Sequence, residues 1–259
     1  MADNNIHTKI DAPLGWIVID RPEKFNAFTE EMWGGLVEAV GVLESAPEVR
    51  VIVIRGAGEK AFSAGADLIG IGQRSEADQS PAVSAFDAFV AVERCTKPTV
   101  AMIHGVCMGG GCGLVLGADL RIAADDARFA ITPARVGLGY AFSGVERAVR
   151  ELGPAVARYL FLTAGEIDAA AALRTGLVHE IHPAAELETA SIALATRIAN
   201  NAPKTIRLLR ESIRQAVLPQ SERQRILVDE LYDACFASQD MREGLAAFSE
   251  KRKPRFQDQ

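Results

Sequence analysis

Short apolar runs that lead through a glycine-rich turn into a helix recur along this chain of 259 residues. The predicted strands cover residues 16–20, 49–54, 99–103 and 120–123. The second strand stops at Gly56 and Gly58, and the third runs into Gly105 and the glycines at 109–111. Buried strands that alternate with helices are typical of parallel sheets. The pattern therefore predicts an α/β fold with parallel strand pairs.

Helices are expected after the strands and throughout the C-terminal third. Thr29 supplies an N-cap, followed by acidic residues, for a helix that reaches about Glu44. Other predicted helices cover residues 82–93, 143–152 and 155–163. From Ala184 onward the pattern is almost wholly helical, with breaks at Pro203 and Pro219. These elements indicate one compact unit with a helical tail.

Composition and charge argue against several classes of protein. With 49% hydrophobic and 24% charged residues, the chain can bury one substantial core with an appended region. The core is expected at residues 1–195 and the appended helical region at 196–259. A net charge of −6, and no run of like charges longer than residues 251–253, gives no footprint for nucleic acid. The polar start and the absence of a long apolar run give no signal peptide and no membrane span. A cytoplasmic protein is expected.

The cysteines and histidines carry no recognisable reactive or metal-binding pattern. The cysteines are Cys95, Cys107, Cys112 and Cys235. Their spacing contains no CxxC and their surroundings are apolar or glycine-rich, so buried free thiols are expected. A cysteine nucleophile would need a histidine nearby, and only His104 is close in sequence. Of the four histidines, only His179 and His182 are closely spaced, so no metal site is predicted.

Two glycine-containing loops, at residues 61–68 and 105–113, each follow an apolar strand and lead toward a helix. Such loops can expose backbone N–H groups, and a pair of them can hold a developing oxyanion. The alternative is that the glycines only allow close packing of helices. Neither loop matches the phosphate-binding patterns of nucleotide sites, so nucleotide binding is not favoured.

Several segments together resemble the crotonase, or enoyl-CoA hydratase/isomerase, superfamily. The matching segments are RPEKFNA at 21–27, KAFSAGADL at 60–68, KP at 97–98, HG at 104–105, GGGC at 109–112, GADLRIA at 117–123, LTAG at 162–165, residues 169–178 and residues 240–252. They cover nearly the whole chain in order. The resemblance implies a spiral of ββα units with a C-terminal helical trimerisation region, assembling as a homotrimer or a dimer of trimers.

The resemblance also implies the ligand, which is an acyl-CoA whose coenzyme A is part of the substrate, so that no separate cofactor is expected. The thioester carbonyl oxygen would lie between the N–H groups of Ala66 and Gly110, which stabilises an enolate. Further binding residues implied in the first loop are Ala64, Asp67 and Leu68. Lys24 and Lys251 are candidate partners of the CoA phosphates, and Lys251 could reach them from a neighbouring subunit. The alternative is that both are solvated surface lysines.

The sequence departs from the family pattern at both positions where hydratases carry a catalytic glutamate. These positions hold Gly113 and Pro133. Because each acid/base group contributes about 10²–10⁴-fold, hydration should be largely lost. The nearest remaining candidates for proton transfer are Tyr140, whose alternative role is packing under the acyl chain, and Glu146. The latter is also explained as a helix-dipole residue after an N-cap at Ser143.

The sequence therefore predicts an acyl-CoA enzyme that acts through an enolate and has nonstandard proton-transfer groups. Decarboxylation of a malonyl-type thioester, or an isomerisation that uses substrate or water as the proton carrier, suits the missing glutamates better than hydration. The alternative is a noncatalytic acyl-CoA-binding protein. Residues 69–85 are expected to form the mobile part of an acyl pocket.

Overall fold

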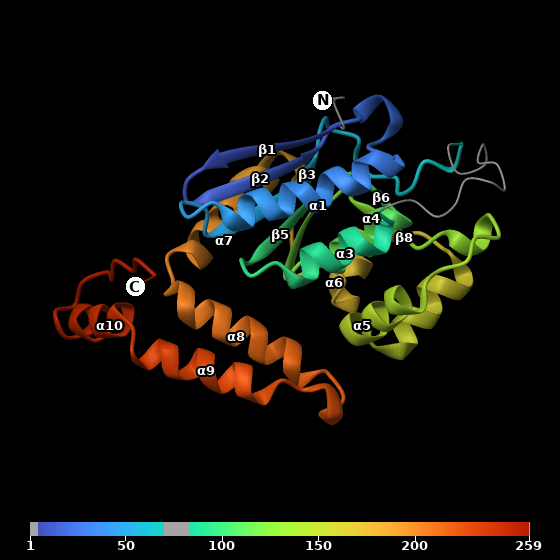
Figure 1. Cartoon of the computed structure of the whole chain (residues 1–259). Helices are drawn as coiled ribbons and strands as arrows, with labels where there is room; N and C mark the ends of the chain where they lie inside the picture. Colours follow the sequence, from blue (N-terminus) through green and yellow to red (C-terminus); the bar gives the residue numbers. More distant parts are fainter. Residues whose placement is uncertain (1–4, 70–82, 259) are drawn as a thin grey trace.

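The computed structural model describes residues 5–69 and 83–258 and contains two sheets. The larger sheet has the order β1-β2-β3-β5-β7-β10, and the smaller one the order β4-β6-β8-β9 (Figure 1). The strands are β1 (Ile6–Asp11), β2 (Leu14–Ile19), β3 (Val51–Gly56), β4 (Ala61–Ser63), β5 (Thr99–Ile103), β6 (Val106–Met108), β7 (Leu120–Ala124), β8 (Arg128–Ala130), β9 (Ile167–Asp168) and β10 (Glu180–His182). The helices are α1 (Glu30–Ser45), α3 (Ala85–Arg94), α4 (Gly110–Val115), α5 (Phe142–Thr163), α6 (Ala169–Thr175), α7 (Leu187–Ala199), α8 (Pro203–Ala216), α9 (Arg225–Phe236) and α10 (Gln239–Ser249).

Successive strand pairs divide themselves between the two sheets. β3, β5 and β7 lie in the larger sheet, and β4, β6 and β8, which follow them in the chain, lie in the smaller one. Within each sheet these strands pair in parallel, and helices α3, α4 and α5 follow the three pairs. The predicted α/β fold, a spiral of ββα units with parallel strands, is confirmed.

The central strands of the larger sheet, such as β3 and β5, are buried on both faces, which explains why they are continuous apolar runs. Along β3, Ile52 and Ile54 face the core that contains α1, whereas Val51 and Val53 face the second core. Helix α7 covers this second core, as its contacts with β3, β5 and β7 show (Figure 1). Successive side chains point to opposite faces of a strand, so a sheet between two helical layers requires apolar residues at every position.

Local signals account for most helix boundaries, with one correction. The Thr29 hydroxyl accepts a hydrogen bond from Met32 N and caps α1, as predicted. Helix α5 begins at Phe142 after Ala141, so the predicted N-cap at Ser143 is wrong. Gly153, with φ of 76°, breaks α5 where the sequence predicts a boundary between two helices.

The first strand was not predicted from the sequence. β1 is an edge strand paired antiparallel to β2, and five of its six residues are exposed. An exposed edge strand carries polar side chains and gives little hydrophobic signal.

The last helices, α8 to α10, lie to one side of the rest of the chain, where α9 packs against α8 and α10, and they expose many apolar side chains (Figure 1). Within the part of the chain that the structure describes, no helix is long and apolar enough to cross a membrane. The thiols of Cys95, Cys107 and Cys112 are free and buried as predicted, and that of Cys235 is free and half-buried. The division of the chain between residues 195 and 196 stays a prediction; it falls inside α7.

Candidate active site

The candidate site lies where three strands of the smaller sheet end. Because β4, β6 and β8 are parallel neighbours, their C-terminal ends share one edge of the sheet. The chain leaves β4 toward Ala66, leaves β6 toward Gly110, and leaves β8 toward Pro133. A hydrogen bond of 2.8 Å from Gly109 N to Ala130 O connects the loop that follows β6 to the end of β8. Parallel pairing therefore brings the two predicted loops together.

The N–H of Ala66 is oriented through the peptide group that it shares with Gly65. Phe28 N donates to Gly65 O at 2.7 Å, and in a trans peptide the N–H points away from the carbonyl. The φ of +94° at Gly65 favours glycine. A Cβ on Gly65 would lie 2.8 Å from Gly110 N and from Met108 O, so no side chain fits where the loops meet.

The N–H of Gly110 is oriented by helix α4, of which it is the first residue. Gly113 N donates to Gly109 O at 3.1 Å, so the N–H of the same peptide points out of the start of the helix. A Cβ on Gly110 would lie 3.5 Å from Ala66 N. Within residues 5–69 and 83–258, neither Ala66 N nor Gly110 N donates to a protein acceptor. Two adjacent free donors of this kind can bind one negatively charged oxygen.

Buried hydrogen bonds hold the first loop in place. Asn26 is fully buried, and its side-chain amide donates to Ala61 O at 2.7 Å and to Ala57 O at 3.0 Å. The Ser63 hydroxyl donates to Asn26 O at 2.8 Å and accepts from Gly65 N at 3.0 Å. These bonds fix the backbone on both sides of the turn that carries the donor.

The remaining predicted binding residues of this loop have different surroundings. Asp67 accepts a 2.8 Å hydrogen bond from the Arg21 guanidinium and one of 3.2 Å from Ile69 N, so its carboxylate is used within the protein. Ala64 donates its N–H to Phe25 O at 2.9 Å. Leu68 is exposed and helical, which agrees with the predicted start of a helix after the loop. Most of the predicted acyl-pocket segment 69–85 lies outside the described residues.

Aromatic side chains fill the space beside Gly113. A Cβ on Gly113 would lie 2.6 Å from Phe89 Cε2 and 2.8 Å from the Tyr140 hydroxyl oxygen. These two rings belong to an aromatic cluster, which comprises Phe28, Trp33, Phe86, Phe89, Tyr140 and Phe161. A longer side chain at residue 113 would therefore require both rings to move. Pro133 is half-buried at the start of a 3₁₀ turn.

The two predicted proton-transfer residues differ in environment. Burial raises the pKa of Tyr140 well above that of a free phenol, so its hydroxyl stays protonated and can donate a hydrogen bond. This environment opposes the predicted alternative in which Tyr140 acts as a base. Glu146 is exposed on α5 but lies beyond its first turn, which does not support the helix-dipole explanation, whereas the next residue, Arg147, is buried.

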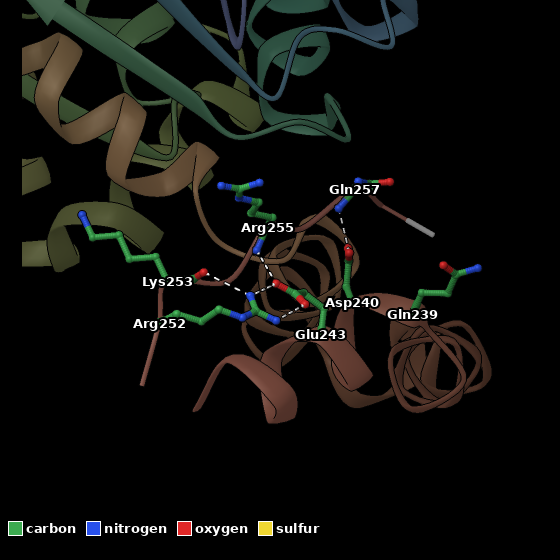
Figure 2. Close-up of a pocket in the computed structure, with 7 residues that line it drawn as sticks. All are labelled: Gln239, Asp240, Glu243, Arg252, Lys253, Arg255 and Gln257. Carbon is green, nitrogen blue, oxygen red and sulfur yellow. Dashed lines mark hydrogen bonds and ion pairs between the residues drawn. The ribbon is translucent and has the colours of Figure 1, made fainter. Parts of the chain in front are cut away.

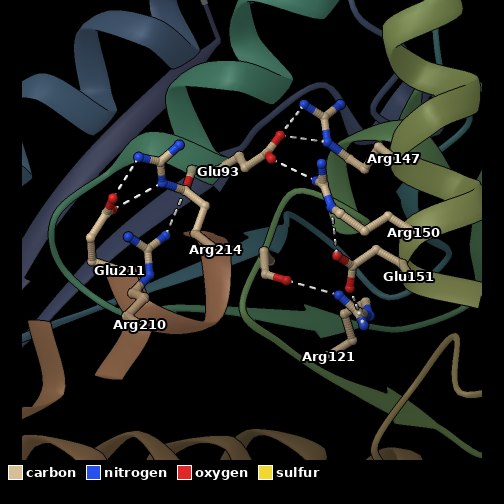
Figure 3. A network of polar contacts seen from close by, with 9 residues as sticks. Glu93, Arg121, Arg147, Arg150, Glu151, Arg210, Glu211 and Arg214 are labelled. Atoms are coloured by element: carbon tan, nitrogen blue, oxygen red, sulfur yellow. Dashed lines mark hydrogen bonds and ion pairs between the residues drawn. The ribbon is translucent and has the colours of Figure 1, made fainter. Parts of the chain in front are cut away.

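A network of charged side chains joins α3 to α5 (Figure 3). Glu93 accepts hydrogen bonds from Arg147 Nε at 2.8 Å and from Arg150 at 2.6 Å. Burial alone would raise the pKa of Glu93, but the two guanidinium groups outweigh it and lower the pKa. The Arg147 guanidinium carbon lies 5.9 Å from the centre of the Phe89 ring. The network therefore supports the ring that fills the space beside Gly113.

The structure does not bring the two predicted CoA-binding lysines together. Lys24 is exposed near the first loop, whereas Lys251 follows α10, at the other end of the molecule (Figure 1). A hollow of about 910 Å³ adjoins the segment after Lys251 and is lined mainly by polar and charged residues (Figure 2). Within it Glu243 pairs with Arg252 at 2.6 Å. Within one chain, Lys251 does not contribute to the site at the strand ends.

Sequence reasoning missed residues that shape the site without providing its donors. Phe28, Trp33 and Phe89 contact the glycine loops, and Asn26 and Ser63 support them. Asn26 and Ser63 stand within the matched segments at 21–27 and 60–68, which offered a signal. The aromatic contacts join distant segments and have no local signature.

Comparisons with known proteins find similar sequences along nearly the whole chain. The family model for enoyl-CoA hydratase/isomerase matches residues 9–259. A short-chain-enoyl-CoA hydratase of Clostridium acetobutylicum is 30% identical over 251 residues, 96% of each chain. A crotonyl-CoA hydratase of Syntrophomonas wolfei is 33% identical over 258 residues, 99% of each chain.

Solved structures are similar over nearly the whole chain. The enoyl-CoA hydratase of Bacillus anthracis aligns with a TM-score of 0.91 and 31% identity, covering 98% of this chain and 100% of that protein. An enoyl-CoA hydratase/carnithine racemase of Magnetospirillum magneticum aligns with the same TM-score and identity, covering 98% and 96%.

Proposed function

We propose that this chain, which belongs to the enoyl-CoA hydratase/isomerase family, is an enzyme that converts an acyl-CoA thioester through an enolate bound by Ala66 N and Gly110 N. The observation that carries the proposal is the adjacency of these two N–H groups, both without a protein acceptor in the described residues. The relatives named as hydratases of enoyl-CoA and crotonyl-CoA support the substrate class.

The two donors would act by stabilising charge that develops on the thioester oxygen. When a proton or a carboxylate leaves the carbon next to the carbonyl, the electron pair moves onto that oxygen. Fixed donors of this kind contribute about 3 kcal/mol each to the transition state. Because they belong to the main chain, the fold itself supplies this part of the chemistry.

The proposal includes the absence of both family glutamates, at Gly113 and Pro133. The support is that Phe89 and the Tyr140 hydroxyl occupy the space beside Gly113, and that this hydroxyl is neutral. A site of this kind is poorly equipped to activate water for hydration.

Decarboxylation of a malonyl-type thioester is the second candidate, favoured by the absence of a carboxylate at Gly113 and Pro133. In this reaction the bond between the α-carbon and the carboxylate breaks and CO₂ leaves. Its electron pair forms the enolate, and a proton from water then adds to the α-carbon. No carboxylate base is needed. The Tyr140 hydroxyl would donate a hydrogen bond to the substrate rather than remove a proton. Glu146, exposed on α5, would remain the alternative proton carrier.

A panel of thioesters tests these assignments. Purified protein is incubated with crotonyl-CoA, a 3-enoyl-CoA and malonyl-CoA, and hydration, double-bond migration and CO₂ release are measured alongside binding by calorimetry. Efficient hydration of crotonyl-CoA would contradict the proposed loss of that chemistry. Tight binding without turnover of any thioester would instead support the noncatalytic acyl-CoA-binding alternative.

We also propose that the chain forms a homotrimer or a dimer of trimers through its C-terminal helices. Large apolar side chains are exposed there, which is unusual for a surface that stays in water. They include Leu209, Ile213, Val217, Ile226, Tyr232, Phe236, Leu245 and Phe248. In such an assembly Lys251 of one subunit and Lys24 of another would bind the CoA phosphates. Sedimentation equilibrium tests the assembly, and CoA affinity of Lys24→Ala and Lys251→Ala tests the lysines.

A further inference from the structure

We infer that Trp33 is a positioning residue that sets the separation of the two oxyanion donors, an inference that rests on the proposed function. A Cβ on Gly110 would lie 3.3 Å from both Cζ2 and Cη2 of Trp33, so the indole edge closes directly on this residue. Trp33 thus packs against Gly110, whose N–H is the second donor. It touches neither the substrate nor a reacting atom, and acts through the backbone that carries the donors.

The same indole is coupled to the first donor through Phe28. The two rings stack with centroids 3.8 Å apart and planes within 6°. The backbone N–H of Phe28 holds Gly65 O at 2.7 Å and thereby orients the N–H of Ala66. One stacked pair therefore spans the distance between the peptide groups that carry both donors. Because aromatic rings are rigid, the stacked rings of Phe28 and Trp33 keep this distance fixed.

The indole has little freedom to move. Trp33 is 5% exposed, and its ring meets the edge of Phe89 at an interplanar angle of 87° with centroids 5.6 Å apart. Phe89 is in turn held near the buried Arg147. A ring confined by neighbours on several sides transmits its position to the backbone that it contacts.

Trp33→Phe removes the part of the ring that reaches Gly110 but keeps an aromatic ring for the stack on Phe28. We expect the variant to fold and to bind CoA thioesters with nearly unchanged affinity for the CoA portion. Because Gly110 loses its support, kcat should fall by about ten- to a hundredfold, the scale of a donor misplaced by less than 1 Å. KM should change much less than kcat.

Trp16→Phe is the matched control, because the chain has only two tryptophans. Trp16 is also buried, at 8% exposure, but it lies in the other core, which α7 covers. Its replacement should leave turnover unchanged. It also leaves Trp33 as the sole tryptophan, whose emission should then change when a thioester binds next to Gly110.

A conjugated aromatic thioester, cinnamoyl-CoA, provides a readout that a purely structural role would not alter. Donors that polarise its carbonyl shift its absorbance to longer wavelength. We expect Trp33→Phe to bind this probe with a smaller red shift than the unaltered chain or Trp16→Phe. An unchanged red shift, with only a lower melting temperature, would overturn the inference alone. No binding of the probe by the unaltered chain would overturn the proposed function together with the inference.

A double-mutant cycle provides a second test. Gly110→Ala places a methyl group against the indole edge in the unaltered chain, whereas in Trp33→Phe the same methyl group fills the vacated space. We expect Gly110→Ala to lower the red shift in the first background and to restore part of it in the second. Independent effects of the two substitutions on the red shift would show that Trp33 does not act through Gly110.

Discussion

Replacing Gly110 by proline should remove one oxyanion donor while leaving the start of α4 intact. Proline has no N–H, and the first position of a helix accepts it because that N–H has no partner within the helix. Gly109, with φ of 52° and ψ of −115°, lies outside the α region that a following proline disfavours. The substitution therefore removes one hydrogen bond to the substrate without removing a bond within the helix.

Gly110→Ala is the matched variant, because it shares the added Cβ but keeps the N–H. That Cβ would lie 3.3 Å from the Trp33 ring in both variants, so both carry the same crowding. The ratio of their activities therefore removes the effect of the added Cβ and leaves the loss of the donor together with the effect of the remaining proline ring atoms. Loss of one donor should cost on the order of 3 kcal/mol, or about a hundredfold in kcat/KM.

The assay measures kcat/KM for the thioester that the unaltered chain converts, with melting temperature as the measure of folding. The proline ring also projects toward the space of the substrate oxygen, so the Kd of free CoA, which lacks that oxygen, is determined as well. Equal kcat/KM for the proline and alanine variants, with both folded, would refute the assignment of Gly110 N as a donor.

Three further substitutions test the packing and charge around the site. Gly113→Glu should lower stability by about 1–3 kcal/mol and confer no hydration of crotonyl-CoA, because its Cβ would lie 2.6 Å from Phe89; a stable, hydrating variant would contradict this. Glu93→Gln should make the melting temperature fall less steeply on acidification. The pKa of Glu93 is lowered in the folded chain, so its stabilising pair with Arg147 is lost as pH falls below about 4.5. Identical pH profiles of the variant and the unaltered chain would argue against this. Asn26→Ala should cost about 2–4 kcal/mol in urea unfolding, because it orphans buried carbonyl groups and puts alanine at a φ of +55°; a loss under 1 kcal/mol would mean that the loop relaxes.

The fold was largely predictable because its strands are buried on both faces. Residues 99–103 form β5 with the predicted limits, since every one of these residues is buried. The edge strand β1 was missed because five of its six residues are exposed, so its sequence shows no alternation of apolar and polar side chains. Register and pairing partners, such as Val53 opposite Val100, depend on contacts between distant segments that no local pattern encodes.

The candidate site was predictable in its backbone and not in its surroundings. Glycines at 65 and 110 reveal close approach of two loops, because any Cβ at residue 65 would collide with backbone atoms of the other loop. The identity of the neighbours is a different matter. Nothing in the sequence says that Trp33 stacks on Phe28, or that Phe89, more than 20 residues before Gly113, fills the space beside it.

The three segments that follow β4, β6 and β8 at one edge of the smaller sheet, here called the strand exits, contribute different kinds of groups to the candidate site. The exits of β4 and β6 supply main-chain groups, whose usefulness depends on geometry and survives the exchange of many side chains. The exit of β8, at Thr132 and Pro133, supplies side chains and a short turn. If the proposed donors bind the substrate oxygen, a fold built in this way can acquire a new reaction by altering the residues after β8 alone, while the loops after β4 and β6 continue to hold the same oxygen.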